Sequence, residues 1–172
     1  MNIRCSFYAK KHDGFTLVEV IVVIILVGIL SVTVASKFTG SDSFAAHSYQ
    51  KPLVSALRLT QQRAMQQTNT SDGYCHQIVF DTVTKKRYGV PDRTNCAITT
   101  FPSPFKPDAT GLDLTNSSDN VTFALVGGGN IVSFNSMGIP QGNCSGGCLI
   151  NIASSVDTVQ VKIESEGYIH AL

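Results

Sequence analysis

Cysteine is the residue type of this sequence best suited to chemistry, because a thiol can form a disulfide or bind a metal ion. Cys5 stands near the start, and the four later cysteines allow three disulfide pairings. Sequence proximity favours Cys75–Cys96 and Cys144–Cys148, with two glycines inside the shorter loop. A zinc site is the alternative, but it would use paired C-x2-C spacings, whereas the one close pair here is C-x3-C. The spacing therefore predicts two disulfides and no metal site.

Histidine and serine side chains give no recognisable catalytic set. The stretches around His47 and Ser145 faintly resemble those of a serine protease. However, Cys144 stands where an aspartate would precede that serine, and 172 residues are too few for the two barrels of such an enzyme. His76 and His170 show no metal-ligand spacing, so we expect strand residues with ordinary partners. With no phosphate-binding glycine loop or paired carboxylates, the sequence predicts no catalytic residue, no cofactor and no enzyme activity.

Lys85, Lys86 and Arg87 form the one dense basic cluster, and they are the candidate contacts for DNA. The formal net charge of the chain is only +1, and many aspartates offset these three residues. A strong basic excess would be needed for general nucleic-acid binding. We therefore expect the cluster to be a solvated turn, and we do not expect nucleic acid as a partner.

An apolar segment near the N-terminus explains why a chain with 15% charged residues has a positive mean hydropathy of +0.12. From Phe15 to Ser36, 16 of 22 residues are apolar, and Glu19 is the one charge. As a helix this segment would be about 33 Å long, enough for a bilayer core of about 30 Å. Arg4, Lys10 and Lys11 precede it and favour a cytoplasmic N-terminus. The pattern predicts a membrane-spanning helix over residues 15–36.

The residues at the start of this segment read Gly14-Phe15-Thr16-Leu17-Val18-Glu19. This motif resembles the type IV prepilin signature, in which a short basic leader ends in Gly and is followed by Phe-Thr-Leu-x-Glu. The resemblance implies that residues 1–14 are a leader that a membrane prepilin peptidase removes between Gly14 and Phe15. It also implies that the same peptidase methylates the new amine of Phe15.

Glu19 has a physical interpretation beside this resemblance. A carboxylate deep in lipid costs about 2.5–3.5 kcal/mol on insertion scales, so it is expected to have a partner. Cleavage would create a positive amine on Phe15, and in a filament the amine of a neighbouring subunit would neutralise Glu19 inside a helical bundle. The resemblance thus implies assembly through Phe15 and Glu19. It names as partners other pilin subunits, the prepilin peptidase and the assembly platform of the inner membrane.

A long helix and a β-rich head are the elements expected to position these residues. The helix is predicted from Phe15 to about Thr68, with an amphipathic second half in residues 37–72 and Pro52 as a kink or a fresh first turn. Short apolar runs separated by turns follow in residues 73–172, and residues 92–120 form a loop-rich excursion. Hairpin turns are expected at 81–85 and 127–130. The predicted strands are His76–Phe80, Lys86–Val90, Val121–Leu125, Ile131–Phe134, Leu149–Ala153, Thr158–Ile163 and Tyr168–Ala171.

This order of elements predicts an α+β fold, in which a long N-terminal helix packs on a C-terminal antiparallel sheet. The head is similar to the GspH/FimT-like minor pilins and pseudopilins, and its order and length are also similar to minor pilins of mannose-sensitive haemagglutinin (MSHA) pili. The residues that carry this similarity are Leu57, Arg63, Ala64, Phe134, Gly138, Val159, Val161, Gly167 and Ile169.

The similarity implies a minor pilin with a single-pass anchor in the inner membrane, a periplasmic head and a final place in a surface pilus. Two other roles stay open. One is a minor pseudopilin of a type II secretion system, which would share all these features, and the other is a DNA-uptake pilin.

Overall fold

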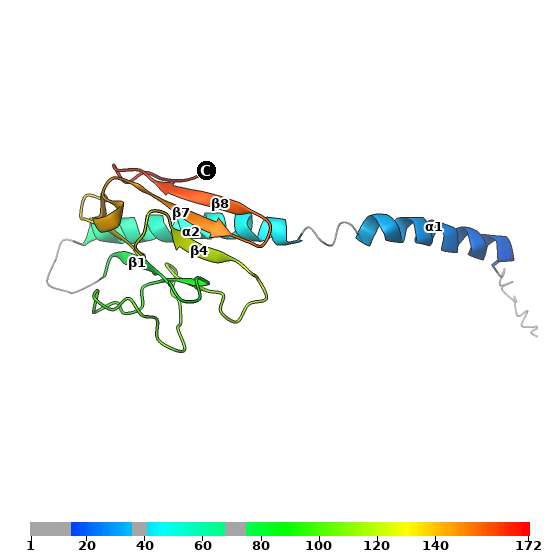
Figure 1. Ribbon diagram of the computed structural model, residues 1–172, viewed down its shortest axis with the longest axis horizontal. Coiled ribbons are helices and arrows are strands. Elements are labelled where there is room, and N and C mark those ends of the chain that lie inside the picture. The colour runs from blue at the N-terminus through cyan, green and yellow to red at the C-terminus, as the bar shows by residue number, and fades with distance from the viewer. Residues whose placement is uncertain (1–14, 36–40, 68–74) are drawn as a thin grey trace, which may run out of the picture. The chain divides into compact units, whose positions relative to one another are not determined.

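The computed structural model of the chain describes residues 15–35, 41–67 and 75–172. The chain divides into two compact units, Met1–Thr39 and Gly40–Leu172, and each is described by itself. Helix α1 (Leu17–Ala35) lies in the first unit. The second unit, called the head below, contains helix α2 (Ser41–Gln66) and all the strands that the structure describes (Figure 1).

Helix α1 is rich in Val and Ile, which are weaker helix formers than Ala or Leu because their β-branched side chains lose rotamer freedom. Its described side chains, from Leu17 to Ser31, are all exposed. A helix that is apolar on all sides needs an apolar partner, which nothing in its own unit supplies among the described residues. Within the described ranges, no helix has both the length and the apolar composition required to cross a membrane.

Helix α2 is amphipathic, and its buried stripe follows helical spacing. Leu53, Leu57 and Ala64 are buried, while Ser55 and Arg58 face solvent. The helix continues through Pro52, whose ring is on the exposed side. The sequence predicts one helix from Phe15 to about Thr68, and the structure describes two helices. The join between them, residues 36–40, lies outside the described residues.

Two antiparallel sheets form the rest of the head. The first has the strand order β3-β2-β1-β5-β6, and the second has the order β4-β7-β8-β9. The strands are β1 (Gln77–Phe80), β2 (Arg87–Gly89), β3 (Leu112–Asp113), β4 (Thr122–Leu125), β5 (Ile131–Phe134), β6 (Pro140–Gln141), β7 (Cys148–Ala153), β8 (Thr158–Ile163) and β9 (Ile169–Ala171), with a 3-10 turn η3 (Gly142–Cys144) after β6.

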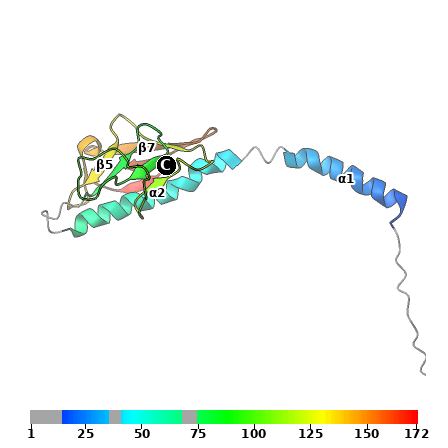
Figure 2. The same cartoon turned by 90° about the horizontal axis from the view of Figure 1, so that it is seen from below.

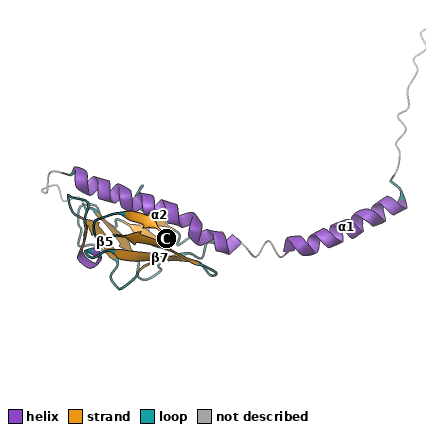
Figure 3. Ribbon diagram, turned by 90° about the horizontal axis from the view of Figure 1, so that it is seen from above, coloured by secondary structure: helices purple, strands orange, loops and turns teal. Residues whose placement is uncertain are grey.

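The core lies where α2 and the two sheets meet. Figure 3 shows α2 along one face of the strands, and its neighbours include β7, β8, β9 and β5. Ile150, Val161 and Ile163 of the second sheet are completely buried there. Between the sheets, the rings of Tyr88 and Phe123 pack edge to face, with their centroids 5.0 Å apart. The prediction of an α+β fold with a long helix on antiparallel strands is confirmed.

The prediction of a hairpin turn at residues 127–130 is wrong. Strand β4 pairs with β7, and β5 pairs with β1, so this segment carries the chain from one sheet to the other. Gly127, Gly128 and Gly129 all have positive φ, a backbone path that side-chain-bearing residues rarely adopt. The sequence prediction also missed β3 and β6, each of two residues, because so short a run has no detectable alternation.

Candidate functional site

The first turn of α1 is built around a hydrogen bond from the backbone N–H of Glu19 to Oγ1 of Thr16, at 3.2 Å. Thr16 thus caps the helix, and Glu19 stands three residues later, which is the T-x-x-E spacing of a capping box. A carboxylate in the first turn is also favoured by the helix dipole. The sequence interpretation missed this role of Thr16, although the T-x-x-E pattern was there to show it.

Phe15 and Glu19 lie four residues apart and line one open groove of about 260 Å³. The groove is otherwise lined by Val20, Val23 and Ile24, which the sequence interpretation did not single out. The Phe15 side chain is 82% exposed. The unit therefore presents one carboxylate beside a large unpartnered apolar surface, an arrangement suited to another apolar helix that carries a positive charge. Gly14, the other residue of the predicted cleavage site, lies outside the described residues.

In the head, the cysteines are bonded in the two pairs that sequence proximity favours. The Cys75–Cys96 disulfide joins the entry of β1 to the loop after β2. Two hydrogen bonds support it there, from the Cys75 N–H to the Arg93 carbonyl and from Gln77 Nε2 to the Cys96 carbonyl. Because the sulfur atoms are bonded to one another, these cysteines are not available as zinc ligands.

The Cys144–Cys148 disulfide closes a short loop between η3 and β7. Cys144 is completely buried within the core cluster, and Cys148 packs against that cluster. This bridge therefore fixes the start of β7, the strand that pairs with both β4 and β8. Both disulfides are structural elements of the head, with no exposed thiol.

The basic cluster at residues 85–87 is divided by the structure. Lys85 is exposed in the turn before β2, while Lys86 Nζ donates to the Asp119 carbonyl at 3.4 Å. Arg87 Nε donates to Asp81 at 2.8 Å, and its guanidinium lies 4.9 Å from the centre of the Phe101 ring. Two of the three cations are thus held within the head, so the cluster is not a continuous basic patch.

Asp81 is a buried carboxylate, and three donors contact it. Burial acts to raise its pKa, but hydrogen bonds from the Thr84 hydroxyl, the Val83 N–H and Arg87, together with the Arg87 charge, lower the pKa below its ordinary value. The charged form of Asp81 is therefore the one that the folded head stabilises. Asp81 organises the turn between β1 and β2, and Arg87 is bound to this turn through its contact with Asp81.

The histidines considered above have separate environments. His47 pairs with Asp157 at 3.2 Å, and His170 pairs with Glu164 at 3.2 Å, so both have ordinary polar partners. For His76 the expected partner is absent at one ring nitrogen, because the Nε2 atom is buried without a hydrogen-bond partner in the described part of the chain. The predicted strand began at His76, whereas β1 begins at Gln77, so His76 lies just before the strand rather than in it.

Comparisons with known proteins give one sequence match and one similarity of fold. Residues 9–35 match the model of the prokaryotic N-terminal methylation motif. A search of curated protein sequences found no match.

The fold is similar to a crystal structure of the type IV minor pilin FimU of Pseudomonas aeruginosa strain PAO1. In one crystal form the TM-score is 0.50 at 13% identity, over 78% of this chain and 90% of that one. In a second crystal form the TM-score is 0.47 at 14% identity, over 73% of this chain and 91% of that one.

The methylation motif and the pilin fold are those of structural subunits rather than enzymes. The motif implies an N-terminus anchored in a membrane and a place among the pilins of a pilus. The chain thus carries the N-terminal methylation motif of prokaryotic prepilins on a protein with the fold of a type IV minor pilin.

Proposed function

We propose that this protein is a minor pilin, a low-abundance subunit that helps to initiate or maintain a type IV pilus. One observation carries the proposal: a prepilin methylation motif over residues 9–35 and a minor-pilin fold occur in one chain. The function would then depend on packing between subunits rather than on catalysis.

The N-terminal part would be processed as in other prepilins. Residues 1–14 would be the leader, removed between Gly14 and Phe15 by prepilin peptidase, which then methylates the Phe15 amine. Residues 15–36 would anchor the protein in the inner membrane, followed by residues 37–72 and the periplasmic head at 73–172. The composition supports this arrangement, since 16 of the 22 residues from 15 to 36 are apolar and basic residues precede them.

Assembly would exchange lipid for neighbouring subunits around α1. The apolar side chains of α1 are exposed from Leu17 to Leu30, and such a surface is stable in a bilayer or in a bundle of similar helices. Glu19 would accept the Phe15 amine of the adjacent subunit, which neutralises both charges as they leave the membrane. The inner-membrane assembly platform would supply the subunits to the growing bundle.

The finer question is which filament the subunit joins. We propose an MSHA-like pilus that serves surface adhesion, on the basis of the order and length of the elements. A minor pseudopilin of type II secretion is the alternative that the same fold allows. A DNA-uptake pilin is less well supported, because Lys86 and Arg87 are already engaged by Asp119 and Asp81.

Deletion of the gene separates the three roles. Loss of surface pili and of adhesion is expected if the proposal is right, with restoration by the wild-type gene. Loss of enzyme secretion with normal pili would assign the protein to type II secretion, and loss of transformation alone would assign it to DNA uptake. Normal piliation in the deletion strain contradicts the proposal.

A further inference from the structure

The start of α2 presents an exposed aromatic side chain. Phe44, in the first turn of this helix, is 73% exposed, although phenylalanine is among the residue types most often buried in soluble proteins. Among the described residues, the aromatic pairs of the head do not include Phe44. Its backbone carbonyl accepts a hydrogen bond from the Ser48 hydroxyl at 2.8 Å, so the ring projects from an ordered turn of the helix.

A second exposed apolar residue lies at the same end of the head. Val156, which is 66% exposed, belongs to the turn between β7 and β8. His47 lies one helical turn after Phe44 on the same side of α2, and it pairs at 3.2 Å with Asp157, the residue next to Val156. Figures 1 and 2 both show the β7–β8 turn beside the start of α2. Phe44 and Val156 are together called the foot of the head below.

The turn that carries Val156 is held by its own hydrogen bonds. Ser154 Oγ accepts from the Val156 N–H at 3.3 Å and from the Asp157 N–H at 3.0 Å. The Ser154 N–H donates to the Asp157 carbonyl at 2.8 Å. The turn therefore has a defined backbone conformation, and Val156 is exposed at its tip rather than packed against the head.

The length of chain before the foot limits its distance from the apolar segment. Helix α1 ends at Ala35 and α2 begins at Ser41. Because an extended chain spans at most about 3.6 Å per residue, the steps from 35 to 41 cover no more than about 22 Å. The three helical steps from Ser41 to Phe44 add about 4.5 Å. If residues 15–36 span the membrane, the foot lies within about 26 Å of the point where the chain leaves the lipid.

We propose that the foot rests on the membrane surface, with Phe44 and Val156 in the headgroup region of the bilayer, before the subunit joins a filament. This inference rests on the proposed membrane anchor at residues 15–36. Aromatic and large apolar side chains are favoured at the boundary between lipid and water, where their burial stabilises the contact. The polar groups beside the foot, His47 and Asp157, are bonded to one another, which leaves the apolar pair as the part of this end suited to lipid.

The foot would fix the orientation of the head as well as its height above the membrane. Phe44 comes from α2 and Val156 comes from the β7–β8 turn, so the contact involves two elements that pack against each other. Contact at two such points hinders rotation of the head about the axis of α2. Each waiting subunit would then present the same face to its neighbours, and its entry into a filament would release the foot from lipid.

Tryptophan fluorescence of the full chain tests this contact, because the protein has no tryptophan of its own. Phe44→Trp and Val156→Trp are made one at a time, and each protein is reconstituted into phosphatidylcholine vesicles. Lipids brominated close to the headgroup are then added as quenchers. We expect the brominated lipid to quench the emission of both variants. Both positions are exposed, so neither substitution should disturb the core, and circular dichroism checks the fold.

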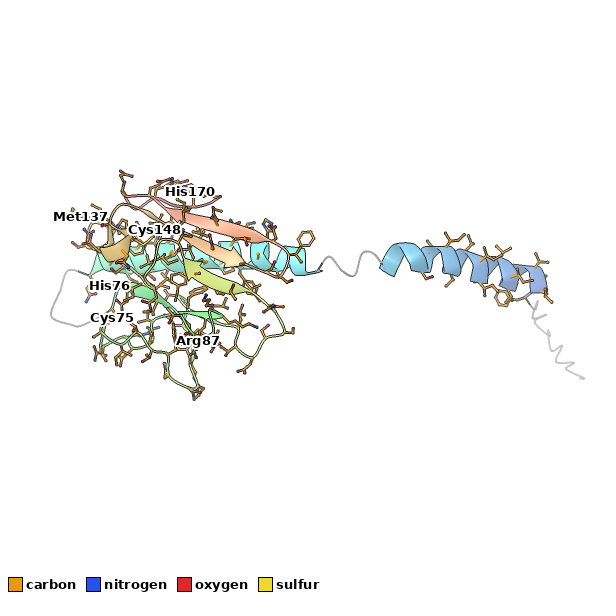
Figure 4. All side chains as sticks on the ribbon, viewed as in Figure 1. Cys75, His76, Arg87, Met137, Cys148 and His170 are labelled. Carbon is orange, nitrogen blue, oxygen red and sulfur yellow. A yellow bond between two sulfur atoms is a disulfide. The ribbon has the colours of Figure 1, made fainter. Side chains whose placement is uncertain are left out.

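Met137→Trp is the matched control in the head. Met137 is 71% exposed, close to the value for Phe44, but it lies at the opposite end of the head (Figure 4). It is next to Gly138, which faces Met65 near the end of α2. Its emission should not be quenched. Quenching at position 137 equal to that at 44 and 156 would mean that the head adheres to lipid without a defined orientation, and it would overturn the proposal.

Ile24→Trp, within α1, separates the foot from the membrane anchor on which it rests. Lipids brominated near the end of the acyl chain should quench this variant if α1 is in the bilayer. Quenching at position 24 without quenching at 44 and 156 overturns the foot and leaves the anchor standing. No quenching at position 24 contradicts the proposed anchor itself, and the foot with it.

Discussion

At the scale of single residues, Asp81 illustrates how a buried charge is tolerated in the head. The carboxylate accepts hydrogen bonds from the Val83 N–H, the Thr84 hydroxyl and Arg87 Nε, so each buried oxygen has a partner. The Asp81 side chain is 6% exposed and the Arg87 side chain 18%. A pair of this kind adds little net stability over an apolar pair, but removal of one partner leaves the other charge buried.

Asp81→Asn should therefore destabilise the head by about 2 kcal/mol, the scale of a hydrogen bond to a charged group. The amide keeps the size of the side chain but leaves the Arg87 guanidinium without its anion. Urea unfolding followed by circular dichroism measures the change. Asp92→Asn is the control, because Asp92 bonds only to Thr94 and Asn95 in its own turn among the contacts described, and its unfolding midpoint should move less. Equal midpoints for the two variants would contradict this account of Asp81.

The same pair gives a pH dependence with a definite sign. The folded head lowers the pKa of Asp81, so the stability that it contributes is complete above the unfolded pKa of about 3.9 and is lost as the pH falls through the folded value. The stability difference between wild type and Asp81→Asn should be constant from pH 5 to pH 8. It should shrink below about pH 4, because the unfolded wild-type chain then takes up a proton at Asp81 that the folded head still excludes. A stability difference between the two proteins that stays constant down to about pH 2.5 would show that the negative charge of Asp81 does not stabilise the head.

At the scale of elements, α2 is the part that joins the two sheets of the head into one core. Its buried residues contact strands of both sheets, and polar side chains of α2 also bond to backbone carbonyls of strand β9 and of two turns. Arg58 Nη2 donates to the Ile169 carbonyl at 2.7 Å, and Gln61 Nε2 donates to those of Gly138 and Gly167. The helix therefore satisfies backbone carbonyls of the edge strand β9 and of two turns, in addition to covering the apolar faces of the sheets.

Leu57→Ala tests how much the α2 interface contributes. Leu57 is completely buried, so its loss should cost about 2–5 kcal/mol from lost burial and the cavity left behind. Leu59→Ala is a control of the same chemistry two residues along, where the side chain is only half-buried. Thermal unfolding of both variants should give a clearly lower midpoint for Leu57→Ala. Similar midpoints would mean that α2 does not pack as the structure describes.

Elements with a strong repeating pattern could be predicted from the sequence, whereas pairing between distant elements could not. The alternation in β8 and the short Ile-Val-Ser-Phe segment of β5 predict the bounds of these two strands to the residue. The cysteine pairs followed from proximity. The path of the chain after β4 could not be predicted in this way, because the same glycine run can close a hairpin or cross between sheets. The choice depends on pairing with β7, which is later in the chain, and with β1, which is much earlier.

The residues of the candidate sites also divide into those that the sequence pattern indicates and those whose contacts form only on folding. Glu19 was evident because a charge in an apolar segment has no local explanation. The role of Arg87 was hidden in the sequence, since Asp81 and Phe101 are brought to it only by folding. Spacing in the sequence carries no information about such contacts.

At the scale of the whole molecule, the proposed maturation changes both mass and charge. Removal of residues 1–14 takes away Arg4, Lys10, Lys11 and Asp13, so the formal net charge changes from +1 to −1. The intact mass of the protein from membranes should lack these residues, carry one extra methyl group and be lighter by four hydrogens for the two disulfides. A strain without prepilin peptidase is the control and should keep the leader. A retained leader in cells with an active peptidase contradicts the proposed processing.

The last prediction concerns Glu19 in the filament. Glu19→Gln keeps the size of the side chain and removes the charge that would pair with the Phe15 amine of a neighbour. The head should fold normally, because Glu19 is exposed and belongs to the other compact unit. The amount of subunit in sheared pili should fall about tenfold at equal cellular levels, the effect of about 1.4 kcal/mol lost from one subunit contact.

Two controls separate the charge from other effects of changing this turn. Val18→Ala alters the apolar surface beside Glu19 without changing charge, and it should assemble nearly as well as wild type because one contact among many is reduced. Thr16→Ala removes the cap of α1, and a loss as large as that of Glu19→Gln would trace the defect to the helix start instead. Normal assembly of Glu19→Gln would mean that the carboxylate is placed in this apolar segment for its favourable interaction with the dipole at the start of α1. In that case the exposed apolar surface of α1 alone would have to specify how the subunits pack.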